Sequence, residues 1–407
     1  MSTETFRPFV SPIRATVIGG LLTAIASVSM ALYTPAMPAL IAAFGTDMAM
    51  IKSSLTAYFA GFALAQLVCG PLSDAYGRRP IAFAFLALYT AAGAVATFAG
   101  TVEVLIAARL VQGIGAAVGV AISRAVVRDL FTGQESARVM NAIGIVLSVG
   151  PAISPTIGGL LSEAFGWWSV FVAMTVFGAA ALASVFFALP ETNRTPDPAL
   201  ARPDRVLATY RRLIADRRFL APVAAIAFSV GPVYSLGTML PFVLIDRVGL
   251  TPTAFGIGML GQTGSFFVGG LVARRAMAAV AADRLVLPAL ILSFLGATAT
   301  LAIGPLWPAT YLSVMIPVGI FAFSMALVIP ALTTAALAPF AEVAGSASAL
   351  MGFLQMGAGF LGGLAATLFA DPVTGLKVVF PTMLAGALAA GVWRRGIGRG
   401  GSAGRHD

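Results

Sequence analysis

Apolar segments long enough to cross a lipid bilayer follow one another along nearly the whole chain. A transmembrane helix needs about 20 mainly apolar residues. Twelve such runs lie at residues 15–44, 51–73, 80–100, 102–127, 138–162, 167–189, 219–245, 253–275, 285–304, 308–338, 345–370 and 376–393. The chain is 59% hydrophobic and only 10% charged, whereas soluble domains are about a quarter charged. The sequence therefore predicts an all-α membrane protein with twelve transmembrane helices.

The basic residues indicate which side of the membrane each connection occupies. An even number of spans puts both termini on one side, and 21 of the 25 Lys and Arg residues fall on that side. Only Lys52, Arg109, Arg247 and Lys377 lie elsewhere. Because connections rich in Lys and Arg stay in the cytoplasm, we expect a bacterial inner-membrane protein with both termini in the cytoplasm. The net charge of +9 then reflects topology, and no nucleic-acid partner is expected.

A long basic connection divides the chain near its middle. We expect a first six-helix bundle at residues 1–190, a cytoplasmic linker at 191–218, a second six-helix bundle at 219–393 and a basic tail at 394–407. The linker holds seven arginines and apolar residues at helical spacing, which predicts a short amphipathic helix on the membrane surface. Six spans on each side of a linker are typical of a two-fold repeat, with the binding site between the halves.

Composition excludes several classes of site. The chain has one cysteine, Cys69, inside an apolar run, and one histidine, His406, in the tail. A disulfide, a zinc site and a Ser-His-Asp triad are therefore not expected. The sequence also has no Gly-x-x-x-x-Gly-Lys nucleotide loop. We expect no enzyme activity, no metal and no cofactor.

Three motifs occupy particular places along the spans. They are Gly70, Asp74, Gly77, Arg78 and Arg79 after the second span, Arg109, Gln112, Gly113 and Gly115 inside the fourth, and Gly150, Pro155, Gly158 and Gly159 inside the fifth. With these motifs the chain resembles the major facilitator superfamily, and more narrowly its twelve-span drug:proton antiporters of Bcr/CflA type. Ala75 and Ser154 depart from the first and third motifs, where a basic residue and a glycine are usual.

The resemblance implies two pseudo-symmetric six-helix bundles that export small molecules by alternating access. It implies multidrug efflux in exchange for protons, carried out by a monomer in the lipid bilayer. It also implies coupling and gating roles for the motif residues and for Asp129, which closes the fourth span. The expected coupling and gating residues are Asp74, Gly77, Arg78, Arg79, Arg109, Gln112, Gly113, Asp129, Pro155, Gly158 and Gly159.

The charges at the inner end suggest a latch between the two halves. Asp74 ends the second span, where the helix dipole disfavours a carboxylate. We expect Asp74 to dock on the start of the eleventh span, at residues 345–348, while Arg78 pairs with Asp129. Each contact would contribute about 0.3–2 kcal/mol, which is small enough for a latch that reopens. The alternative is that Arg78 and Arg79 are topology anchors.

Arg109 lies about seven residues into the fourth span, roughly 10 Å deep. A charge at that depth marks a functional site, so the side chain is expected to face the bundle interior and to bond to carbonyls, water or Gln112. The alternative is that it extends to the membrane interface.

The expected substrate-binding residues are Tyr33, Tyr58, Gln66, Tyr234 and Gln355. Each of them can equally form a hydrogen bond between helices. No acidic residue lies near the centre of a span, and Ala31 stands where relatives usually carry an aspartate. We therefore expect neutral or anionic amphipathic substrates and leave the proton carrier unassigned. A dedicated exporter or facilitator for one sugar, nucleoside or amino acid is the alternative, although the spans offer few polar side chains for such a substrate.

Overall fold

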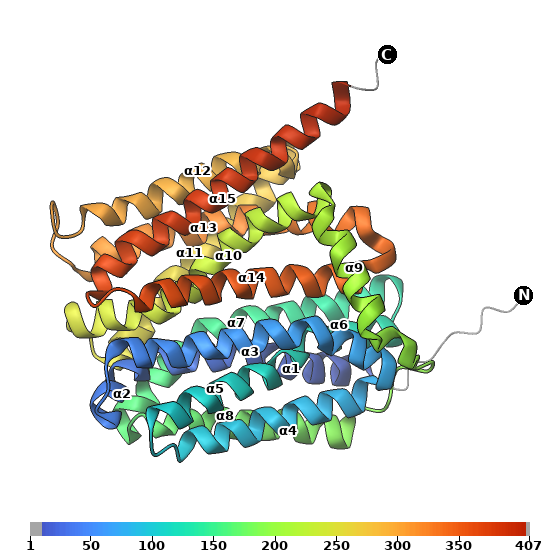
Figure 1. The fold of residues 1–407 in the computed structure, drawn as a ribbon, viewed down its shortest axis with the longest axis horizontal. Coiled ribbons are helices and arrows are strands. Elements are labelled where there is room, and N and C mark those ends of the chain that lie inside the picture. The colour runs from blue at the N-terminus through green and yellow to red at the C-terminus, as the bar shows by residue number, and fades with distance from the viewer. Residues whose placement is uncertain (1–9, 404–407) are drawn as a thin grey trace, which may run out of the picture.

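The computed structural model describes residues 10–403, which form long helices lying side by side (Figure 1). The elements of the first half are α1 (Pro12–Tyr33), η1 (Thr34–Ala36), α2 (Met37–Phe44), α3 (Met48–Tyr76), α4 (Arg78–Thr97), α5 (Val102–Ala116), α6 (Val118–Leu130), α7 (Gly133–Phe165) and α8 (Trp168–Ala188). Those that follow are η2 (Pro198–Ala201), α9 (Pro203–Ala215), α10 (Arg217–Pro241), η3 (Phe242–Arg247), α11 (Pro252–Ala279), α12 (Ala282–Thr298), η4 (Ala299–Ala302), α13 (Tyr311–Leu337), η5 (Ala338–Val343), α14 (Ala344–Thr367) and α15 (Pro372–Ala403).

Within the described residues, eleven continuous helical stretches are long and apolar enough to cross a membrane. The longest stretch, Tyr311–Thr367, contains both α13 and α14. These two helices meet at η5, where Phe340 leaves helical geometry with φ −125° and ψ 37°. Counting α13 and α14 separately gives twelve crossings. The predicted fold class, an all-α protein with twelve spans in two bundles, is confirmed.

Each half has its own buried core. The core of the first half includes Tyr33, Phe59 and Phe171, and the core of the second includes Phe219 and Phe321. The halves meet along α3 and α14, which lie next to each other through the middle of the molecule (Figure 1). A second contact between the halves joins α7 and α11.

The two ends of the bundle differ in charge. We call the end that holds α9 and the start of α1 the basic end, and the opposite end, which holds α2, the far end (Figure 1). Four of the seven linker arginines lie on or beside α9: Arg202, Arg205, Arg211 and Arg212.

Helix α9 contacts both halves at the basic end. Tyr210 and Leu213 are buried, and the Tyr210 hydroxyl donates a hydrogen bond to the Leu67 carbonyl of α3, 2.7 Å away. Burial raises the pKa of Tyr210, so this hydroxyl stays protonated and remains a donor. On its exposed side, Arg212 pairs with Glu342 of η5 at 3.2 Å. The linker helix therefore packs on the protein itself.

Candidate functional site

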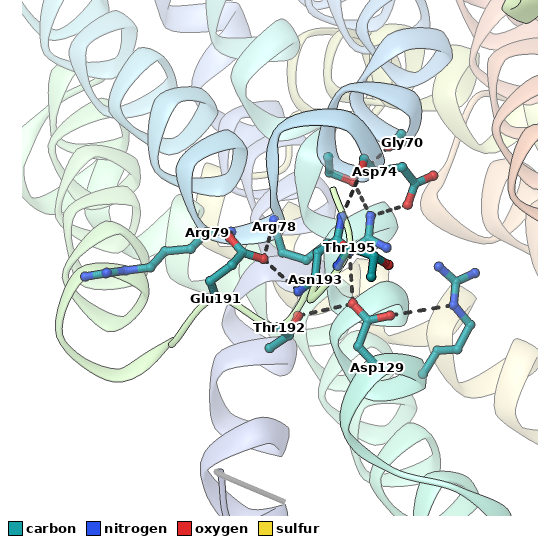
Figure 2. A network of polar contacts seen from close by, with 11 residues as sticks. Gly70, Asp74, Arg78, Arg79, Asp129, Glu191, Thr192, Asn193 and Thr195 are labelled. Carbon is teal, nitrogen blue, oxygen red and sulfur yellow. Dashed lines mark hydrogen bonds and ion pairs between the residues drawn. The ribbon is translucent and has the colours of Figure 1, made fainter. Parts of the chain in front are cut away.

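A cluster of charged groups joins α3, α4 and α6 at the basic end (Figure 2). The Arg78 guanidinium, whose side chain is only 5% exposed, donates to the carboxylate of Asp74, which lies four residues earlier in the chain near the end of α3. It also donates from Nε to Asp129 Oδ2 at 3.0 Å and from Nη1 to Ser73 Oγ at 2.8 Å. Two carboxylates and a hydroxyl therefore surround one buried cation, which offsets the cost of removing it from water.

Glu191 connects the segment after α8 to this cluster (Figure 2). Its two carboxylate oxygens accept the backbone N–H groups of Arg78 and Arg79 at 2.9 and 3.0 Å. A carboxylate at the start of α4 satisfies free N–H groups and complements the positive end of the helix dipole. Gly77 makes this approach possible because its φ is +101° and because a Cβ there would lie 2.6 Å from Glu191 Oε2.

The neighbouring residues of the same segment extend these contacts. Thr192 donates to Asp129 at 3.2 Å, and the Asn193 amide donates to the Asp74 carbonyl at 2.8 Å. Arg79 turns away from the cluster and donates to the Phe186 carbonyl of α8 at 2.7 Å. The charged motif thus fastens the chain that leaves α8 onto the first half.

The expected pairing of Arg78 with Asp129 is confirmed, but the expected docking of Asp74 on α14 is not what the structure shows. Asp74 pairs instead with Arg78, because the turn at Gly77 between α3 and α4 brings the start of α4 back beside the last turn of α3. Arg78, Asp74 and Asp129 all belong to the first half. Their contacts stabilise that half and do not form a latch between the halves.

Arg109 is completely buried in the first half. It donates from Nη1 to Gln112 Oε1, one turn further along α5, and lies against Met174 of α8. Its guanidinium carbon lies 4.7 Å from the ring centre of Tyr33 and 4.4 Å from that of Tyr58. Both distances are within the range of a cation–π contact. The prediction that Arg109 faces the bundle interior is confirmed.

Two donor atoms of this guanidinium, Nε and Nη2, are buried without a hydrogen-bond partner in the described part of the chain. None of the ion pairs formed by the described residues includes Arg109. A buried charged donor without an acceptor is costly, and charges kept at such depth are typical of functional sites. Arg109 therefore retains capacity to bind an acceptor group.

Glycines set the close packing around Arg109 and between the halves. A Cβ at Gly113 would lie 2.1 Å from the Tyr58 carbonyl, and one at Gly158 would lie 2.1 Å from the Leu32 carbonyl. A Cβ at Gly159 would lie 2.3 Å from the carbonyl of Pro252 in the second half. Only glycine allows backbones to approach this closely. Pro155 lies within α7, which runs unbroken through it.

The structure separates the five expected substrate-binding residues into two groups. Tyr33 and Tyr58 contact Arg109, and their hydroxyls already bond to Ser54 Oγ at 2.6 Å and to the Ala26 carbonyl at 3.1 Å. The other three are Gln66 on α3, Tyr234 on α10 and Gln355 on α14, and the first two contact the opposite half.

The second group lies among close contacts between the halves. Gln66 packs against Gly352 of α14, and its side-chain oxygen is buried without a partner in the described part of the chain. The Tyr234 ring lies 5.2 Å from that of Phe59 on α3.

Sequence reasoning did not give a role to Glu191 or to Tyr89. Glu191 stands 113 residues from Arg78 in the chain, so only the fold reveals its contact. Tyr89 bonds to Ser29 of α1 beside the Arg109 site. One usable signal was the Leu-Pro-Glu-Thr sequence at 189–192, because a polar group directly after a span is well placed to cap a neighbouring helix.

Known proteins similar to this chain are transporters. It is 27% identical over 389 residues to the MFS-type transporter YdgK of Bacillus subtilis, covering 91% of this chain and 92% of the relative. It is 26% identical over 358 residues to a bicyclomycin resistance protein homolog of Haemophilus influenzae, covering 86% and 88%. It is 29% identical over 241 residues to the multidrug transporter MdfA of Yersinia pestis, covering 59% of each chain.

The fold is shared with solved transporters. A bacterial homolog of the human lysosomal transporter Spinster, in an inward-facing and occupied conformation, superposes with a TM-score of 0.71 at 15% identity, covering 94% of this chain and 96% of that one. The model of the Major Facilitator Superfamily matches residues 19–363. The chain is a membrane transporter of small molecules and not an enzyme, and it belongs to the Major Facilitator Superfamily.

Proposed function

We propose that this protein is a secondary active exporter of small amphipathic compounds, neutral or anionic, which it moves by alternating access in exchange for protons. The observation that carries this proposal is the state of Arg109, a buried cation with two free donor atoms and no carboxylate partner among the described residues. A buried cation of this kind favours an anionic or acceptor-bearing substrate and disfavours a cationic one. The names of the relatives, a bicyclomycin resistance protein homolog and a multidrug transporter, support export of drug-like compounds.

Aromatic contacts connect Arg109 to the boundary between the halves. Tyr58 lies against Arg109, its ring centre is 6.0 Å from that of Phe59, and Phe59 in turn contacts Tyr234 of the second half. A change in the pairing of Arg109 can therefore shift side chains that contact the other half. These contacts support a coupling role for Arg109.

We also propose a membrane orientation and an oligomeric state for the protein. The excess of basic residues at one end supports an inner-membrane orientation with both termini in the cytoplasm. We propose that the protein works as a monomer, as its resemblance to the family implies.

The test uses purified protein in liposomes with an imposed pH gradient and a panel of neutral, anionic and cationic labelled compounds. We expect gradient-driven movement of neutral and anionic members of the panel. Transport that ignores the gradient would refute proton exchange, and movement of cationic compounds alone would refute the substrate class. Movement of a single metabolite would favour the dedicated exporter instead.

Variants of Arg109 sharpen this test. Arg109→Met keeps an unbranched side chain but removes the charge, and we expect it to abolish gradient-linked transport of anionic compounds. Arg138→Met is the matched control, because Arg138 is exposed at the basic end. Equal transport by the two variants would argue against a role for Arg109.

A further inference from the structure

A buried lysine joins the two halves at the far end. Lys52, in the second turn of α3, is fully buried. Its ammonium group donates to the carbonyl of Ala366, in the last turn of α14, at 3.0 Å, and to that of Phe369, two residues beyond the end of the helix, at 3.5 Å. The last carbonyls of a helix form the negative end of its dipole. A cation from the first half therefore caps a helix of the second half.

A glutamate makes the converse contact on the other side of the boundary between the halves. Glu163, near the end of α7, accepts the backbone N–H of Thr253 at 3.0 Å. Thr253 is the second residue of α11, where the helix dipole is positive. An anion from the first half therefore caps the start of a helix in the second half.

The backbones next to these two contacts touch. A Cβ at Gly159 would lie 2.3 Å from the Pro252 carbonyl, and one at Gly256 would lie 2.3 Å from the Pro155 carbonyl. On the other helix pair, a Cβ at Gly363 would lie 2.8 Å from the Thr56 hydroxyl. Both helix pairs are therefore closed at the far end.

We propose that Lys52 and Glu163 are gate residues, which hold the far end of the transporter shut and release it in each transport cycle. Both contacts link a charge to a helix end and not to an opposite charge. The nearest carboxylate of the second half, Asp371, is already bonded to Arg247 and Thr374. When the halves separate, water can replace the helix-end partners of Lys52 and Glu163, so the gate is reversible. The strong ion pairs of Arg78, by contrast, lie within one half.

This inference needs only that the halves move against each other, and not that the substrate or the coupling ion is as proposed above. The test can therefore be independent of transport. The chain has two lysines, Lys52 and Lys377, and both lie at the far end. Lys377 is only half-buried and lies beside Gly304 of the second half. It serves as the reference for amine labelling within the same molecule.

The experiment labels purified full-length protein with a water-soluble amine-reactive reagent and measures the modification rates of both lysines by mass spectrometry. Glu163→Gln removes the negative charge from one gate contact and leaves Lys52 intact as the reporter. Because the loss of this charge removes a favourable contact with the positive end of the α11 dipole, we expect the rate at Lys52 relative to Lys377 to rise about two- to fivefold. The control is Glu103→Gln, which changes the other glutamate of the far end, one that is exposed and belongs to the first half.

A second variant guards against a loss of folding. Glu163→Asp keeps the charge but shortens the side chain by one methylene, which breaks the contact to Thr253, and we expect a rise in the same direction. Equal relative rates at Lys52 in both Glu163 variants and in Glu103→Gln would overturn the proposal. A parallel rise at Lys52 and Lys377 would indicate general unfolding and would also count against a specific gate. A failure of the export proposal would leave these labelling rates unchanged.

Discussion

The close spacing of α3 and α5 depends on the absence of a side chain at Gly113. Adding one methyl group there, by Gly113→Ala, therefore tests this helix crossing. A Cβ at Gly113 would lie 2.1 Å from the Tyr58 carbonyl oxygen and 3.1 Å from the Phe62 nitrogen, whereas ordinary contact begins at 3.4 Å. Both obstacles are backbone atoms, so Gly113→Ala must push the two helices apart by more than about 1 Å. Overpacking of this kind costs about 1–3 kcal/mol. The shift also moves Arg109 away from the Tyr58 ring, which now lies 4.4 Å from it.

Thermal unfolding in detergent measures this effect. For a unit of about 150–250 residues, 1 kcal/mol corresponds to about 2–4 °C in Tm, so we expect Gly113→Ala to lower Tm by roughly 2–12 °C. Gly357→Ala in α14 is the matched control, because a Cβ there meets nothing within 4 Å. Alanine is favoured over glycine inside a helix, so the control is expected to hold or raise Tm. A Gly113→Ala protein that melts at or above the control would refute the close crossing.

Three further substitutions separate strong contacts from weak ones by the same thermal measurement. Glu191→Gln leaves one N–H group at the start of α4 without its acceptor, so a loss of about 1 kcal/mol is expected, against no change for the exposed Glu135→Gln. Tyr210→Phe removes the hydrogen bond to α3 and should cost about 1 kcal/mol; no loss would mean that α9 is held by apolar contacts alone. Arg212→Gln breaks an exposed pair with Glu342 and should cost under about 1 kcal/mol; a larger loss would show that this pair anchors the linker.

The fold class could be predicted because the thickness of the hydrocarbon core sets the length of each span, and the positions of Lys and Arg set the side of each connection. Local breaks within the helices could not be predicted in this way. The predicted fourth span is divided at Ala117 into α5 and α6, close to glycines whose helical cost is offset by contacts from other spans. The break between α13 and α14 lies where the predicted spans end and begin, between residues 338 and 345, but the compact helical form of the connection, η5, was not predicted.

The contacts of the site could be predicted only where the free-energy cost of a charge in lipid, or a spacing of one helical turn, determined them. The burial of Arg109 follows from the cost of a charge in lipid, and one of its partners, Gln112, lies one turn away. Tyr33 and Tyr58 come from two other helices, so their approach to Arg109 required the fold. The expectation for Asp74 was wrong because it weighed a distant helix end above an arginine four residues away.

The hydrogen bonds of Glu191 to the start of α4 also determine which part of the chain links the two halves. Residues 191–197 are bound to the first half as far as Asp197, whose N–H donates to the Asp74 carbonyl at 3.3 Å. The stretch from Pro198 to Asp216 connects this bound segment to α10, and α9 takes up most of it. A gene split after Asp197 would leave the first fragment with α4 capped, whereas a split after Pro190 would strip that cap away. The part of the chain that links the two halves is thus shorter than the whole connection between α8 and α10.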